Sequence, residues 1–128
     1  IICGGGGGIP TIMDKGKYIG VDGVIDKDYV MSMIASQTEC DIFMILTNVP
    51  NVYINFGTKN EKKLEKIKVS EIKYYIDTHQ FGQGSMLPKV DAAIKFVKSG
   101  HNRKAIIAQL EDLEKAIEGK AGTIIVNE

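Results

Sequence analysis

The sequence predicts an α/β domain in which helices cover both faces of a mainly parallel sheet. The first observation is the segment 41–47, a continuous apolar run typical of a strand buried on both faces. The second is that strand-like and helix-like segments alternate along the chain, as in parallel α/β folds. The length of 128 residues, with 44% hydrophobic content, suits one domain with its own core.

The first segment reads as a short strand at residues 1–3 that breaks into five glycines, Gly4 to Gly8. Glycines after a strand let the backbone turn sharply and present N–H groups to an anion. A linker or a tight turn is the alternative, and the run by itself favours it. It has neither the spacing of a dinucleotide fingerprint nor the Lys-Ser/Thr of a phosphate-binding loop. Residues 11–13 and 18–21 then flank an Asp-Lys-Gly turn and predict a β-hairpin.

A helix is expected from Asp28 to about Thr38, with Asp28 as its N-cap. Apolar side chains cover nearly its whole circumference, so we expect this helix to be buried. Lys27 and Asp28 then lie at the edge of the core. They are either a capping group with solvated neighbours or a cation held and aimed by its carboxylate.

The buried strand 41–47 ends in Thr47 and Asn48, at the strand end where open α/β sheets bind ligands. The segment 51–57 is expected to be irregular or briefly extended. The lysine-rich segment 59–68 predicts a solvated face rather than a binding patch.

Ser70 is expected to cap a short helix, and the turn 82–84 leads to a helix that starts at Pro88 and closes at Gly100. Lys89 lies in the first turn of that helix, where the helix dipole disfavours a cation. We therefore expect an anion opposite Lys89, a phosphate first of all. On another face of this helix, Asp91 and Lys95 are spaced for an i,i+4 ion pair. The remaining elements are expected to be a strand at 104–108, a helix at 110–118 and a strand at 123–126.

Composition excludes several classes of function. Lys+Arg and Asp+Glu balance at 16 each, so no basic field argues for nucleic acid or an anionic membrane. No apolar run approaches the roughly 20 residues of a spanning helix. Cys3 and Cys40 make no disulfide framework, which favours a reducing, cytoplasmic setting. No transition-metal site, Ser-His-Asp triad or pair of catalytic carboxylates stands out. The residues alone predict phosphate or nucleotide binding and allow lysine-based phosphoryl transfer.

Five short segments occur in a fixed order along the chain: Gly4–Pro10, Val24–Asp28, Ile45–Thr47, Tyr53–Gly57 and Gly84–Val90. Together they resemble the carbamate kinases of the amino-acid kinase superfamily. The resemblance spans essentially the whole chain and corresponds to the C-terminal half of that family. The chain also starts without methionine, so we expect residues 1–128 to be the C-terminal, nucleotide-binding part of a longer amino-acid kinase domain.

The resemblance implies a three-layer αβα sandwich and a phosphotransferase that interconverts ATP plus carbamate with ADP plus carbamoyl phosphate, using Mg²⁺. It also implies a homodimer when full-length and ATP formation in arginine breakdown, at the end of the arginine deiminase pathway. Activity is expected only when the missing half is present. Two alternatives remain: another amino-acid kinase with a carboxylate or nucleoside monophosphate acceptor, and a truncated nucleotide-binding module without catalysis.

The resemblance also implies roles for individual residues. Lys27 and Lys89 would hold the transferring phosphoryl group, and Asp28 would orient them. Met86 and Tyr53 would lie near the base of the nucleotide. No protein residue is expected to bind a metal directly. The remaining residues are Gly5, Gly6, Gly7 and Gly8 for carbamate or carbamoyl phosphate, and Thr47, Asn48 and Ser85 for the nucleotide.

Overall fold

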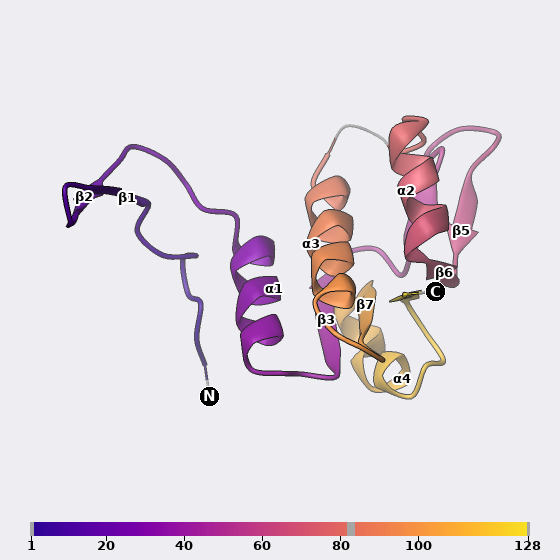
Figure 1. The fold of residues 1–128 in the computed structure, drawn as a ribbon. Coiled ribbons are helices and arrows are strands. Elements are labelled where there is room, and N and C mark those ends of the chain that lie inside the picture. Colours follow the sequence, from indigo (N-terminus) through magenta and orange to yellow (C-terminus); the bar gives the residue numbers. More distant parts are fainter. Residues whose placement is uncertain (1, 82–83, 128) are drawn as a thin grey trace.

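The centre of the molecule is a four-stranded sheet with the strand order β3-β7-β8-β6 (Figure 1). In this computed structural model, residues 2–81 and 84–127 are described. β3 pairs with β7 and β6 with β8 in parallel, whereas β7 and β8 are antiparallel. The mainly parallel sheet is thus confirmed, with β8 reversed beside β7. The strands are β3 (Ile42–Thr47), β6 (Lys66–Lys68), β7 (Lys104–Gln109) and β8 (Thr123–Val126).

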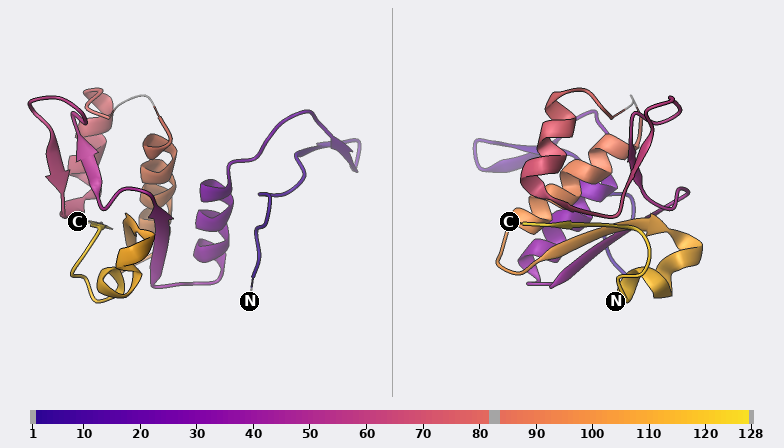
Figure 2. Two further views of the ribbon diagram at one scale, coloured as in Figure 1. Left: turned by 180° about the vertical axis from the view of Figure 1, so that it is seen from behind. Right: turned by 90° about the vertical axis from the view of Figure 1, so that its right-hand side faces the viewer.

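Helices lie on both faces of this sheet, as Figure 2 shows. α2 and α3 cover one face, and α1 packs beside α3. The short α4 packs on β7 from the opposite face, where Ala116 meets Ile106 and Ala108. The αβα arrangement is confirmed, although its second helical layer is small. The helices are α1 (Lys27–Gln37), α2 (Val69–Asp77), α3 (Met86–Lys98), the 3-10 turn η1 (Leu110–Asp112) and α4 (Leu113–Ile117).

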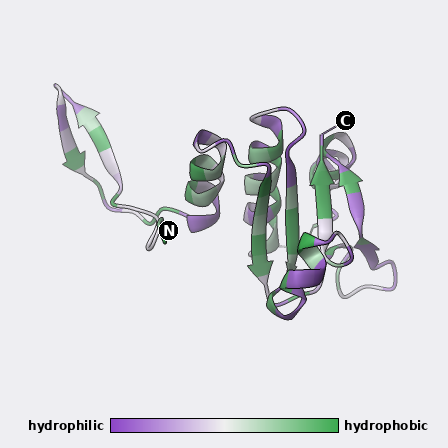
Figure 3. Ribbon diagram, turned by 90° about the horizontal axis from the view of Figure 1, so that it is seen from below, coloured by the Kyte–Doolittle hydropathy of each residue, from purple (hydrophilic) through white to green (hydrophobic). Residues whose placement is uncertain are grey.

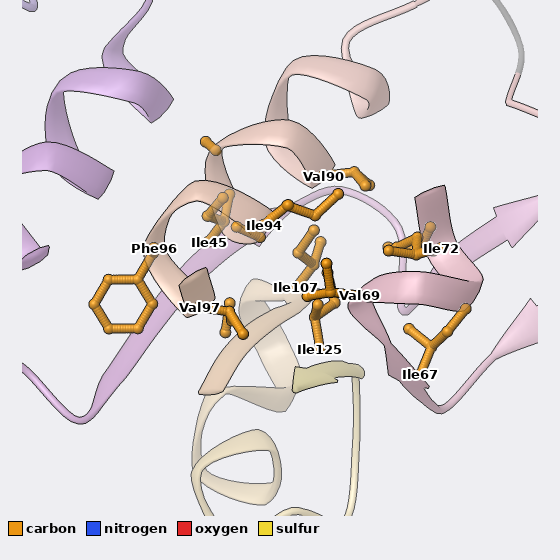
Figure 4. Packing of buried hydrophobic residues seen from close by; sticks show 14 of the residues in the cluster. Ile45, Ile67, Val69, Ile72, Val90, Ile94, Phe96, Val97, Ile107 and Ile125 are labelled. Atoms are coloured by element: carbon orange, nitrogen blue, oxygen red, sulfur yellow. The ribbon is translucent and has the colours of Figure 1, made fainter. Parts of the chain in front are cut away.

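The main core lies between α3 and the sheet (Figure 4). Val90, Ile94 and Val97 lie at the i, i+4 and i+7 positions of α3 and are buried against the strands. Period-2 alternation in β3 sends Phe43 to the same side, 5.4 Å from the Phe96 ring. α3 is therefore fixed rigidly on the sheet, and its N-terminal turn has a fixed position.

Three expected helix boundaries differ from the structure. α3 begins at Met86, so Pro88 is its third residue rather than its first. Proline is still tolerated there, because N–H groups in the first turn have no intrahelical partner. α2 begins at Val69 with Lys68 before it, so Ser70 is not its cap. The expected helix 110–118 is divided into η1 and α4. The turn expected at 82–84 lies partly outside the described residues, which omit 82 and 83.

The lysine-rich segment is not simply a solvated face. It contains β5 (Lys62–Leu64), which pairs antiparallel with β4 (Val52–Ile54), and it also contains β6. Leu64 and Ile67 are buried between exposed lysines, which hides the strand signal in a charge-rich sequence. The Thr123 hydroxyl accepts the Val52 N–H at 2.8 Å and joins this strand pair to β8.

The predicted hairpin is confirmed as β1 (Thr11–Asp14) and β2 (Lys17–Gly20), which extends away from the body of the molecule (Figure 3). The strand expected at residues 1–3 is wrong for its described part, because Ile2 and Cys3 are exposed and form no strand. Residue 1 lies outside the described residues.

The expectation of a buried α1 is also wrong. Only Ser32 and Ala35 of this helix are buried, and Met33 is 54% exposed. The reason is that α1 packs with one side on α3, while the N-terminal hairpin extends away from its other side. The expected N-cap, Asp28, is wrong as well, because α1 begins at Lys27 and its N-cap is Asp26. The Asp26 carboxylate accepts the Asp28 N–H at 2.8 Å, and this leaves the Asp28 side chain free for another partner.

No helix in the described part of the chain has the length and apolar character needed to cross a bilayer.

Candidate functional site

The five residues expected to surround a nucleotide line one cavity, which we call the β3–α3 cavity. It has a volume of about 240 Å³ and lies between the C-terminal end of β3, β4 and the start of α3. Five residues separated by up to 39 positions (86 − 47) therefore meet at one place. The lining residues are Thr47, Asn48, Val49, Tyr53, Phe56, Phe81, Gly84, Ser85 and Met86.

The β3–α3 cavity combines an aromatic wall with a few polar groups. The Tyr53 and Phe56 rings meet edge to face with their centres 5.8 Å apart. The Thr47 hydroxyl donates to Asn48 Oδ1 at 3.3 Å. Apolar walls with a few polar groups that fix orientation are typical of small-molecule sites. Met86 adds a further apolar side chain to the lining.

Lys89 lies one turn after Met86 on α3, and its ammonium is paired with Asp28 of α1. The Lys89 Nζ–Asp28 Oδ2 distance is 2.8 Å, and the two side chains are 19% and 22% exposed. The anion opposite Lys89 in this structure is therefore a carboxylate, where the sequence predicted a phosphate first. An ammonium group has more donors than this one contact uses, so Lys89 can still bind an arriving anion.

Lys27 is placed differently. It is the exposed first residue of α1 and takes part in none of the ion pairs found among the described residues. Neighbouring residues on a helix point in different directions, so the Asp28 carboxylate that holds Lys89 does not also hold Lys27. The structure brings Asp28 and Lys89 together and leaves Lys27 beside them at the end of the helix.

The glycine run packs against the segment that leads into α1. The Gly7 N–H donates to the Gly4 carbonyl at 2.6 Å and closes a tight turn. Gly7 has φ +97°, and a Cβ there would lie 2.7 Å from the Ile25 carbonyl oxygen, so no larger residue fits. Gly5, Gly6 and Gly8 are exposed.

A second cavity, the α1–β3 cavity, has a volume of about 570 Å³. Cys3, which precedes the glycine run, lines it together with Asp28 and the apolar side chains of α1 and β3. Asp28 therefore borders the α1–β3 cavity and also contacts Lys89. Lys89 in turn stands one helical turn from the β3–α3 cavity. The two sides meet at the Asp28–Lys89 pair.

Sequence reasoning missed one set of contacts. The expected Asp91–Lys95 ion pair is confirmed at 3.0 Å, but Asp91 also accepts the Tyr29 hydroxyl at 2.8 Å. The Lys95 ammonium lies 4.1 Å from the centre of the Tyr29 ring. The hydrogen bond to Asp91 raises the pKa of Tyr29 to about 12, with burial and the charges of Asp91 and other nearby carboxylates adding to it. Tyr29 looked like one apolar residue among many, and nothing in the sequence marked its hydroxyl.

The family model described as "Amino acid kinase family" matches residues 1–109. A carbamate kinase-like protein of Mycoplasma pneumoniae is 56% identical over 126 residues, which are 98% of this chain and 41% of that protein. A carbamate kinase of Thermoplasma volcanium is 51% identical over 122 residues, 95% of this chain and 40% of that protein. The chain thus spans about two-fifths of the length of these curated relatives.

Among solved structures, the carbamate kinase from Giardia lamblia bound to AMP-PNP superimposes with a TM-score of 0.89 at 43% identity. The match covers 96% of this chain and 43% of that one.

Proposed function

The chain belongs to the amino acid kinase family, and on that premise we propose that the polypeptide carrying it is a carbamate kinase. It would transfer a phosphoryl group between ATP plus carbamate and ADP plus carbamoyl phosphate. The observation that carries the proposal is the Asp28–Lys89 pair, a part-buried lysine held at 2.8 Å one turn from a cavity lined by all five expected nucleotide residues. The similarity to carbamate kinases supports the choice of acceptor.

Phosphoryl transfer needs in-line positioning and cations over the oxygens of the moving group, and little covalent chemistry from the protein. In the proposed mechanism the base lies in the β3–α3 cavity against Tyr53 and Met86. Lys89, aimed by Asp28, donates to the transferring phosphoryl group. Lys27 supplies a second positive charge from the first turn of α1. The exposed Gly5, Gly6 and Gly8 would turn their N–H groups to carbamate or the carbamoyl group, and Gly7, whose N–H is bonded to the Gly4 carbonyl, would hold the turn.

Mg²⁺ is proposed to arrive with the nucleotide. This ion is usually bound by substrate phosphates, waters and one or two protein oxygens. No group of three or more His, Cys, Asp or Glu side chains lies together in the described part of the chain. The side-chain oxygens that line the β3–α3 cavity, those of Thr47, Asn48, Tyr53 and Ser85, are hydroxyl and amide oxygens without charge, which fits an ion held mainly by the nucleotide's phosphates. When bound, Mg²⁺ would neutralise phosphate charge.

The resemblance also supports finer proposals. The physiological direction would be ATP formation from carbamoyl phosphate in arginine breakdown, in the cytoplasm. The complete enzyme would be a homodimer.

The test is ATP formation from ADP and carbamoyl phosphate, coupled to hexokinase and glucose-6-phosphate dehydrogenase, with the longest natural polypeptide that carries residues 1–128. We expect NADPH formation that requires ADP, carbamoyl phosphate and Mg²⁺ together. No turnover with carbamoyl phosphate, but turnover with an acyl phosphate or a nucleoside diphosphate as donor, would show another amino-acid kinase. ADP binding without any turnover would show a nucleotide-binding module. Either result would overturn the assignment.

A further inference from the structure

α1 and α3 lie side by side and are joined along their length by polar contacts, which we call the α1–α3 seam (Figures 1 and 2). It begins with Asp28–Lys89, the pair at the proposed site. Next come Tyr29 Oη to Asp91 Oδ2 at 2.8 Å and Ser32 Oγ to the Ala92 carbonyl at 2.8 Å. At the far end Ser36 accepts from two residues that follow α3, Ser99 Oγ at 2.9 Å and Arg103 Nη2 at 3.1 Å.

Apolar packing fixes α1 only weakly. Ala35 is its one fully buried apolar residue, Tyr29 and Met31 are only partly buried against the core, and the other buried residue, Ser32, is polar. Hydrophobic contact is non-directional and would let a helix with so small a buried face slide or rotate. Hydrogen bonds have narrow limits of distance and angle, so the seam determines which residue of α1 faces which residue of α3.

The Tyr29–Asp91 contact lies next to the Asp28–Lys89 pair of the proposed site. Tyr29 follows Asp28 directly, and Asp91 comes two residues after Lys89. The Lys95 ammonium contacts the same Asp91 oxygen, Oδ2, at 3.0 Å and lies over the Tyr29 ring at 4.1 Å. The carboxylate is therefore held by two donors and cannot turn away from Tyr29 without losing both.

We propose that Tyr29 and Asp91 are positioning residues that hold α1 against α3 so that the Asp28 carboxylate stays on the Lys89 ammonium. Neither residue lines the β3–α3 cavity, so neither is expected to touch the nucleotide. Their effect on phosphoryl transfer rests on the proposed function. Their effect on the Asp28–Lys89 geometry does not.

A purely stabilising contact is the competing explanation, and it predicts different results. It would lower the stability of the fold without changing the environment of Lys89 in the folded molecules. The chain offers a matched control: Tyr75 of α2 donates its hydroxyl to Glu71 at 3.0 Å, away from the seam. Tyr75→Phe removes the same chemical group as Tyr29→Phe and leaves α1 and α3 untouched.

The first measurement needs no enzymatic activity. The accessibility of each lysine is measured in the folded protein by brief acetylation at neutral pH and quantitative mass spectrometry. Tyr29→Phe and Asp91→Ala are expected to raise the labelling of Lys89 several-fold relative to the exposed Lys98, and Tyr75→Phe is not. Unchanged Lys89 labelling in both seam variants would overturn the proposal, as would an equal rise in Tyr75→Phe.

The second measurement is kinetic and uses the coupled assay on the longest natural polypeptide. Loss of one hydrogen bond that aims a catalytic group is expected to lower kcat roughly tenfold. The KM for ADP is expected to stay within about twofold, because the cavity is intact. The double variant should resemble the single ones, because both remove the same contact. A kcat within about twofold of the original in both single variants would overturn the positioning role. If the unsubstituted protein shows no turnover, the proposed function fails and the labelling result still decides the geometry.

Discussion

At the scale of the residue, Lys89 is explained by its partner. A cation in the first turn of α3 is disfavoured by the helix dipole, and the Asp28 carboxylate at 2.8 Å offsets that cost. The pair is only part-buried, so each group remains within reach of a ligand. Such a lysine is more useful for binding a transient anion than for stabilising the fold, since exposed and half-exposed ion pairs contribute little stability.

Replacing this lysine should therefore affect turnover much more than folding. We expect Lys89→Ala and Lys27→Ala each to lower kcat at least about a hundredfold, because one preorganised donor typically contributes roughly 3–4 kcal/mol in the transition state. The coupled assay measures kcat, and far-UV circular dichroism checks the fold. Lys98→Ala, an exposed lysine in the last turn of α3, is the control and should be neutral. Near-normal turnover of either purified variant would remove that lysine from the mechanism.

Tyr29 gives a prediction for pH. Its pKa is raised from 10.0 to about 12, mainly by the hydrogen bond to Asp91. A phenol with a higher pKa in the folded than in the unfolded chain adds stability that is complete below pH 10. That contribution is lost as the pH rises from about 10 to about 12. Subtracting the phenolate absorbance of Tyr29→Phe from that of the original protein isolates the signal of Tyr29. This signal should titrate near pH 12, and Asp91→Asn should move its titration to lower pH. A difference titration near pH 10 in the original protein would show that the hydrogen bond is absent.

At the scale of the element, the sequence predicted best where one interaction dominates. The strands at 41–47, 104–108 and 123–126 are apolar runs whose burial decides their structure, and each is found within one residue at either end. The hairpin follows from its Asp-Lys-Gly turn, and Lys15 and Gly16 there do have positive φ. Local chemistry was sufficient for these elements.

Prediction from the sequence failed where tertiary contacts determine the secondary structure or the buried face of an element. In β5 and β6, one buried side chain per strand outweighs the lysines around it, and only the neighbouring strands reveal this. α1 is apolar around its circumference, but only one side of it packs on the rest of the fold, mainly on α3 and partly on β3. Periodicity therefore gave no information on which face is covered. For the site, motif resemblance named five residues that line the β3–α3 cavity but did not name its Phe56 and Phe81. The partners of Lys89 and Tyr29, about 60 positions away along the chain, needed the fold.

The turn between α4 and β8 gives a prediction of stability. Gly122 has φ +80°, and a Cβ there would lie 2.8 Å from Ala108 Cβ and 2.9 Å from the Ile107 carbonyl oxygen. Gly119 has φ +76°, but the nearest atom to a Cβ there is 3.8 Å away. Gly119→Ala should therefore cost about 1 kcal/mol for the backbone alone, and Gly122→Ala about 2–4 kcal/mol, because crowding adds to it. Urea unfolding measures both, and equal losses would show that β8 shifts to accept the methyl group.

At the scale of the whole molecule, the two sides of the site are carried by different parts of the chain. The β3–α3 cavity is built on the sheet and α3, which are joined by the main core. The glycine run and Lys27 are on the N-terminal segment, which has little buried surface. The chain also spans about two-fifths of its relatives' length. Nucleotide binding should therefore be separable from turnover.

The 128-residue chain is expected to bind ADP reversibly and to form no ATP from carbamoyl phosphate. Isothermal titration calorimetry measures the binding, and the coupled assay measures the turnover. Tyr53→Ala should weaken ADP binding roughly tenfold, because an aromatic contact contributes about 0.5–1.5 kcal/mol beyond the area that it buries. Tyr18→Ala, on the hairpin where Tyr18 is 76% exposed, should leave ADP binding unchanged. Of these two tyrosines, Tyr53 lines the β3–α3 cavity and Tyr18 does not. Equal weakening of ADP binding by both substitutions would therefore place the nucleotide elsewhere.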